Sequence, residues 1–293
     1  MNRRRAAEAA LVFNVIVWGA TFVLIKAALT DVSPVLFLAL RFTLATGALL
    51  AVFRSSAMPW RSWKTAGAGA LAGIFLFSGY AFQTMGLRLT TAPRSAFITG
   101  LTSVAVPLLA AVVYRVKPQV SEVMGVLIAT AGLALMTLPG VLGPVGWGDL
   151  LTVCCAAGFA AHIVTLGHFS EKMGYELLAV GQIAISAVLS WSLFSFLETP
   201  HVVWRPVVVW AILITGLLCT ALAFSLMAWA QRYTSPTRTA LIFMLEPVFA
   251  WLTSYLTVGE GLSGRAAAGA ALILGGVAMA ELKPLKPRPH RFQ

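Results

Sequence analysis

Side chains that could hydrogen-bond or stack against a small solute are spaced along an apolar segment near the start of the chain. Asn14, Trp18 and Thr21 follow at intervals of four and three residues within NVIVWGATFVLIKAALTD (14–31), so they share one face of a helix. Amide and hydroxyl groups are costly in lipid and should face the interior of a helix bundle. Asn14 therefore either lines a solute path or hydrogen-bonds a neighbouring helix.

The same spacing recurs 141 residues later with Cys155, Phe159 and His162. His162 either lines or gates a path, or makes a satisfied bond between helices. The candidate substrate-binding residues are Asn14, Trp18, Thr21, Tyr80, Gln83, Thr99, Phe159, His162 and Phe243. Their aromatic rings offer stacking surfaces, and their amides and hydroxyls can bind an amino-acid head group. This lining favours neutral or amphipathic solutes over sugar phosphates, which need several deep basic residues.

Three charged residues lie in or beside apolar segments. Arg41 is deep in one of them and needs an anion or several carbonyl groups, and Glu246 is an acidic residue at comparable depth. The two are a possible coupling or charge pair. Lys26 lies near a segment end, where its stem could extend to water or its ammonium group could meet a substrate carboxylate.

The chemistry of a membrane enzyme is not indicated by these residues. The sequence holds no HExxH or GxSxG motif, and its four histidines are scattered. Its three cysteines lie in apolar runs without a CxxC pair, so we interpret them as small buried residues. We expect neither a catalytic residue, nor a bound metal, nor a cofactor.

Composition places these residues in an integral membrane protein. Hydrophobic residues make up 59% of the chain and charged residues 11%, with a mean hydropathy of +0.87. Soluble domains carry about 25% charged residues. Apolar runs long enough to cross a bilayer predict ten helices, at 6–28, 34–53, 65–86, 92–114, 120–138, 148–168, 175–197, 206–229, 237–256 and 265–282. The connections between them are too short to hold a soluble catalytic domain.

The basic residues lie mainly in the gaps between apolar runs. They outnumber acidic residues by 21 to 10, which in a soluble protein would suggest a nucleic-acid partner, but here they indicate topology. With a cytoplasmic N-terminus, fifteen Lys and Arg residues fall on the inner side and five on the outer side. We therefore expect both termini in the cytoplasm, with membrane lipid and a small solute as partners and no nucleic acid. The oligomeric state is open.

The chain repeats itself at an offset of about half its length. Shifted by 144 residues, GLRLTTAPRSAFITGL (86–101) falls on AQRYTSPTRTALIFML (230–245), and Gly125 and Gly132 fall on Gly269 and Gly276. The pattern predicts a five-helix repeat at 1–147, a second at 148–282 and a basic cytoplasmic tail at 283–293. Because five is odd, the second repeat enters the membrane inverted, as in many secondary transporters. The fold class is thus an all-α membrane protein of ten helices in two inverted repeats.

Several short segments resemble one transporter family. WGATFVLIK, LRLTTA, QRYTSP, LEPVFAWLTSYLTVGE and GAALILGGVAM, in this order, are similar to the EamA-type branch of the drug/metabolite transporter superfamily, and within it to YddG-like exporters of aromatic amino acids. The first repeat departs from the pattern, with Thr102 and Ser103 where the second has Glu246 and Pro247.

The resemblance implies a secondary transporter in a bacterial inner membrane that exports small metabolites by alternating access, above all aromatic or other neutral amino acids. Two alternatives within the superfamily stay open. One is an exporter of amphipathic or cationic drugs, and the other is an antiporter of nucleotide sugars or sugar phosphates.

Overall fold

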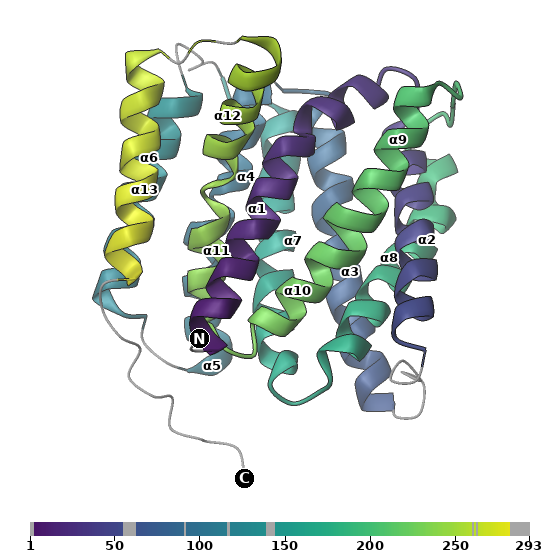
Figure 1. Cartoon of the computed structure of the whole chain (residues 1–293), viewed down its shortest axis with the longest axis horizontal. Coiled ribbons are helices and arrows are strands. Elements are labelled where there is room, and N and C mark those ends of the chain that lie inside the picture. Colours follow the sequence, from purple (N-terminus) through teal and green to yellow (C-terminus); the bar gives the residue numbers. More distant parts are fainter. Residues whose placement is uncertain are drawn as a thin grey trace.

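Long apolar helices make up the bundle, as the hydrophobic runs predicted (Figure 1). The computed structural model describes residues 3–54, 63–90, 92–115, 118–138, 144–259, 261 and 263–281. Within these ranges nine helical spans are long and apolar enough to cross a membrane, and a tenth apolar helix, Gly264–Ala280, is slightly shorter. The basic tail expected at 283–293 lies outside the described residues.

The first repeat contributes six helices to five membrane crossings: α1 (Arg3–Ala28), α2 (Pro34–Val52), α3 (Trp63–Leu87), α4 (Ala92–Gly100), α5 (Thr102–Tyr114) and α6 (Val120–Thr137). The second contributes α7 (Trp147–Ser170), α8 (Tyr175–Leu197), α9 (Pro206–Ile214), the π-helix η2 (Thr215–Leu222), α10 (Ala223–Ala230), α11 (Pro236–Phe243), α12 (Glu246–Val258) and α13 (Gly264–Glu281). Each fourth crossing of a repeat is therefore broken into two helices.

The breaks fall at equivalent positions of the two repeats. The first lies at Leu101 and the second at Met244 and Leu245, and residue 101 shifted by 144 is residue 245. Pro247 lies in the first turn of α12, where its missing N–H leaves the Phe243 carbonyl without a helical donor. Each break leaves backbone polar groups inside the bundle, where they are tolerated only if protein or water satisfies them.

The contact between α6 and α13 shows the inversion directly. Gly125 packs against Gly276, and Gly132 packs against Gly269, so the two helices run antiparallel. The shift that carries Gly125 to Gly269 also carries Gly132 to Gly276, and it therefore exchanges one contact for the other. Two contacts that are exchanged in this way are the signature of a two-fold axis between inverted repeats, and the predicted inversion is confirmed.

Ion pairs at the two ends of the bundle follow the same symmetry. At one end Arg94 of α4 pairs with Asp149 of α7 at 2.8 Å, and at the other Arg238 of α11 pairs with Glu8 of α1 at 3.4 Å. Arg238 also donates to the carbonyl of Ala280 at 3.2 Å. The start of α1 and the end of α13 are thus on one side of the bundle (Figure 1).

Candidate functional site

The middle of the bundle is organised around the π-helix η2. Three side chains from the first two helices reach its Cys219 and Thr220. The indole Nε1 of Trp18 donates to the Cys219 carbonyl at 2.9 Å, and the hydroxyl of Thr21 lies 3.1 Å from the Cys219 sulfur. The Arg41 Nε donates to the Thr220 hydroxyl at 2.7 Å. Short π-helical stretches occur often at functional sites because their wider turns displace backbone carbonyls from regular helical bonding.

Aromatic rings surround these polar contacts. Tyr80 of α3 packs edge-on against Phe159 of α7, with ring centroids 5.2 Å apart, and against Phe42 at 5.7 Å. Trp18 packs edge-on against Phe243 of α11 at 4.9 Å. These five rings come from five different helices, so segments remote in sequence assemble one aromatic region with half-buried faces on Trp18, Tyr80, Phe159 and Phe243.

Asn14 and His162 are more deeply buried and are bonded to neighbouring helices. The Asn14 amide donates to the carbonyl of Ala223 in α10 at 2.7 Å, and its side chain has no exposed surface. The His162 Nε2 lies 2.6 Å from the Gln182 side-chain oxygen in α8. Of the two interpretations that the sequence left open, this geometry favours bonds between helices for both residues.

The other two polar candidates lie nearer accessible surface. Gln83 is half-buried and lies one turn from Tyr80 on the same helix. The Thr99 hydroxyl lies 3.7 Å from the Cys155 sulfur, which brings the helices α4 and α7 together at the level of the site. Gln83 thus lies one turn from Tyr80, and Thr99 contacts Cys155, which lies one turn from Phe159 on α7.

The possible charge pair between Arg41 and Glu246 does not form in this structure. Arg41 is almost completely buried, and its guanidinium instead donates to Thr220 and to the Tyr80 hydroxyl, the latter at 3.2 Å. Its carbon atom lies 5.1 Å from the centroid of the Tyr80 ring. Glu246 is half-buried at the start of α12 and has no ion-pair partner among the described residues.

The sequence alone missed the role of the π-helix. Cys219 was expected to be a small buried residue, and it is 1% exposed, but its carbonyl and sulfur also bind Trp18 and Thr21. Thr220 was not singled out. Its hydroxyl donates to the carbonyl of Thr215 five residues earlier, at 2.8 Å. Two threonines five residues apart, Thr215 and Thr220, are the local sequence signal for the π-helix. The signal is weak because faces of an α-helix are recognised by intervals of three and four residues.

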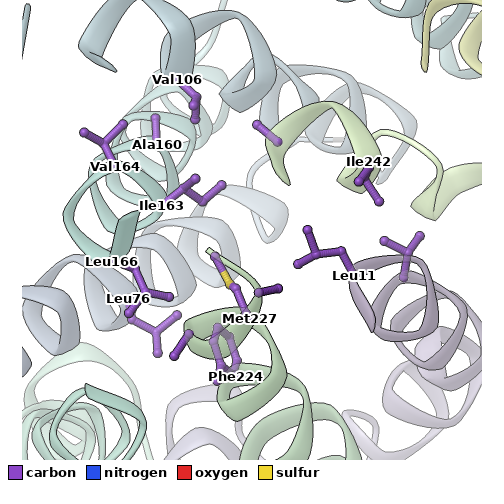
Figure 2. Packing of buried hydrophobic residues seen from close by; sticks show 14 of the residues in the cluster. Leu11, Leu76, Val106, Ala160, Ile163, Val164, Leu166, Phe224, Met227 and Ile242 are labelled. Carbon is purple, nitrogen blue, oxygen red and sulfur yellow. The ribbon is translucent and has the colours of Figure 1, made fainter. Parts of the chain in front are cut away.

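A cluster of apolar side chains closes the bundle on the side where α1 begins. Figure 2 shows Leu11 of α1, Ile163 of α7, Met227 of α10 and Ile242 of α11 gathering from four helices, and all are buried. Nearby, Gly167 of α7 packs so closely on α11 that a Cβ atom would lie 2.6 Å from a ring carbon of Pro236. This end of the bundle is therefore tightly packed.

Some equivalent positions at the opposite end are more accessible. Shifted back by 144 residues, buried Met227 becomes half-buried Gln83, and shifted back by 141 residues, buried Leu166 becomes half-buried Ile25 and buried Gly167 becomes exposed Lys26. The equivalents of Leu11 and Ile242, which are Thr152 and Ile98, are buried like their mates, so the two repeats differ in packing at particular positions only.

Comparisons with known proteins agree with this architecture. The EamA-like transporter family matches residues 6–138 and again residues 146–282, one match for each repeat. A protein of Archaeoglobus fulgidus named an uncharacterized transporter is 33% identical over 283 residues, covering 96% of this chain and 87% of its own. The Bacillus subtilis transporter YvbV is 28% identical over 267 residues, covering 88% of this chain.

A solved crystal structure superimposes with a TM-score of 0.81 at 22% identity, covering 95% of this chain and 97% of its own, which supports the fold. The family match to both repeats and the 33% identity to the archaeal transporter show a transporter rather than an enzyme. The protein is a multi-pass membrane transporter, and the chain belongs to the EamA-like transporter family.

Proposed function

We propose that this protein exports small neutral metabolites, above all aromatic amino acids, from the cytoplasm by alternating access. The observation that carries the proposal is the group of half-buried rings of Trp18, Tyr80, Phe159 and Phe243 beside the polar groups of the π-helix. Rings at this depth supply stacking surface for an aromatic side chain. The adjacent hydroxyl, amide and guanidinium groups supply hydrogen bonds for a polar head group.

The orientation and the location are part of the same proposal. The basic residues between the spans favour cytoplasmic termini, and the family resemblance implies a bacterial inner membrane. In that orientation the start of α1 faces the cytoplasm, and the end of the bundle that carries the exposed Lys26 faces outward.

A second candidate function is export of amphipathic cations. It is favoured by one observation, the half-buried Glu246 carboxylate that has no ion-pair partner among the described residues. A buried carboxylate beside aromatic rings attracts a cation by charge and by the ring faces. A sugar-phosphate substrate is less well supported, because Arg41 is a single basic residue at the aromatic region.

Transport by purified protein in liposomes tests the proposal. Phenylalanine, a lipophilic cation and a nucleotide sugar would be supplied separately. We expect phenylalanine to be transported, and we expect Trp18→Ala and Tyr80→Ala to weaken its apparent affinity several-fold, since a lost stacking contact costs about 1 kcal/mol. Trp210→Ala is the matched control because Trp210 is 60% exposed on α9. Transport of the cation alone would favour the second candidate.

A further inference from the structure

Two opposite charges lie in the interior of the spans near the aromatic region without pairing with each other. Arg41 is 4% exposed, and Glu246 is half-buried. Among the described residues no carboxylate lies within 4.0 Å of the Arg41 guanidinium. A buried charge is expensive inside a membrane protein, so an uncompensated one is retained for a purpose.

The other repeat carries neutral residues at the positions equivalent to these charges. The position equivalent to Arg41 is Gln182, a neutral residue that bonds to His162 at 2.6 Å. The position equivalent to Glu246 is Thr102, whose hydroxyl donates to the carbonyl of Ala156 at 3.3 Å. The same helix positions are thus filled by neutral, bonded side chains in the other repeat, and each charge occurs once.

The described neighbours of Arg41 hold its guanidinium in place and engage only some of its donors. Its hydrogen bonds to Thr220 at 2.7 Å and to Tyr80 at 3.2 Å use two of the five N–H groups of an arginine side chain. The rings of Tyr80 and Phe42 lie 5.1 and 5.7 Å from the guanidinium carbon. A planar guanidinium with further donors is suited to bind a carboxylate through two parallel hydrogen bonds.

Glu246 supplies the opposite charge close to the same rings. It begins α12 directly after the helix break, and it follows Phe243, whose ring centroid lies 4.9 Å from that of Trp18. Arg41 donates to the Tyr80 hydroxyl and so lies at the same group of rings. Both charged residues are therefore placed next to aromatic surface.

Resting on the export function proposed above, we infer that the substrate is a zwitterion. Arg41 binds its carboxylate, Glu246 binds its ammonium group, and the rings of Trp18, Tyr80 and Phe159 contact its side chain. A zwitterion satisfies both charges at once, whereas a simple cation or a simple anion would leave one of them buried and unpaired. The site thereby selects against substrates with a single charge.

Three probes that share one phenyl ring test the inference: phenylalanine, 2-phenylethylamine and 3-phenylpropionate. Their competition against labelled phenylalanine would be measured with the full chain in liposomes. In the unsubstituted protein we expect phenylalanine to compete at least tenfold better than either analogue. Arg41→Gln should weaken phenylalanine and phenylpropionate about tenfold or more but spare phenylethylamine, and Glu246→Gln should show the opposite selectivity.

Arg232→Gln and Glu176→Gln are the matched controls, since they remove the same charges outside the aromatic region. Elution as a single peak in size-exclusion chromatography would show that each variant is folded, and Arg41→Lys would supply a second variant that keeps the charge.

Equal loss of affinity for all three probes in both Arg41→Gln and Glu246→Gln would overturn the inference. If phenylalanine competes no better than the analogues but is still transported, the zwitterion inference is wrong and the export function stands. If phenylalanine is not transported, the export function itself fails.

Discussion

Gly132 of α6 and Gly269 of α13 approach so closely that a Cβ atom on either would lie 2.5 Å from the carbonyl oxygen of the other. Gly125 and Gly276 repeat this contact further along the same two helices. Small residues let membrane helices come together closely enough for their backbones to pack, which replaces the hydrophobic effect that is missing in lipid. The two contacts hold the fifth and the tenth crossings together across the repeat axis.

Gly276→Ala should therefore destabilise the protein, by about 1–3 kcal/mol if it behaves as other overpacked positions do. Its added methyl group would lie 2.5 Å from the Gly125 carbonyl oxygen. Gly275→Ala is the matched control, because nothing lies within 4 Å of its Cβ position on the same helix. Thermal denaturation in detergent would compare the two variants. Equal melting midpoints would show that α6 and α13 can move apart to accept the methyl group at little cost.

Arg238→Gln should cost more stability than its repeat equivalent, Arg94→Gln. The Arg238 side chain is fully buried and pairs with Glu8 and Glu122, whereas that of Arg94 is 18% exposed. Removing one partner of a buried ion pair costs about 3–5 kcal/mol, because the remaining charge stays buried. Unfolding midpoints of both variants would be measured side by side. A larger loss of stability for Arg94→Gln than for Arg238→Gln would contradict the deeper burial of the Arg238 ion pairs.

Asn14→Ala should mainly lower stability, and Trp18→Ala should mainly weaken substrate affinity. Asn14 donates to a backbone carbonyl of α10 and has no exposed surface, so its loss should lower stability by about 0.6 kcal/mol, at most about 1.7, and leave substrate dependence nearly unchanged. Trp18 has a half-buried ring, and its loss should mainly weaken substrate affinity. Parallel melting and transport titrations would separate the two, and a selective loss of affinity in Asn14→Ala would return that residue to the substrate-binding set.

Reporter fusions should place both termini in the cytoplasm. A reporter after Gln293 and another within 54–64 should read as cytoplasmic, and one within 139–147 as external, because fifteen of the twenty basic residues outside Arg41 then fall on the inner side. The structure already puts the start of α1 and the end of α13 on one side, since Arg238 contacts both Glu8 and Ala280. An external C-terminus would contradict the orientation proposed for the transport direction.

The sequence alone determined the helices and their symmetry. A span in lipid must satisfy its own backbone hydrogen bonds and present about twenty apolar residues, so hydrophobic runs mark the crossings directly. The glycines that pack at the repeat axis were also visible, because Gly125 and Gly132 fall on Gly269 and Gly276 without a gap. The shared face of Asn14, Trp18 and Thr21 followed from helical spacing, and all three contact the π-helix or the helix after it.

Only the tertiary structure decided which polar groups meet. Helical periodicity gives the face of a residue but not the helix opposite it, so the sequence suggested Glu246 as the partner of Arg41, and the structure instead places Thr220 and Tyr80 there. The π-helix was equally hidden, because its hydrogen bonding depends on side chains that arrive from α1 and α2. The difference in burial between Met227 and its repeat equivalent Gln83 was hidden as well, because it depends on contacts between helices that the sequence does not specify.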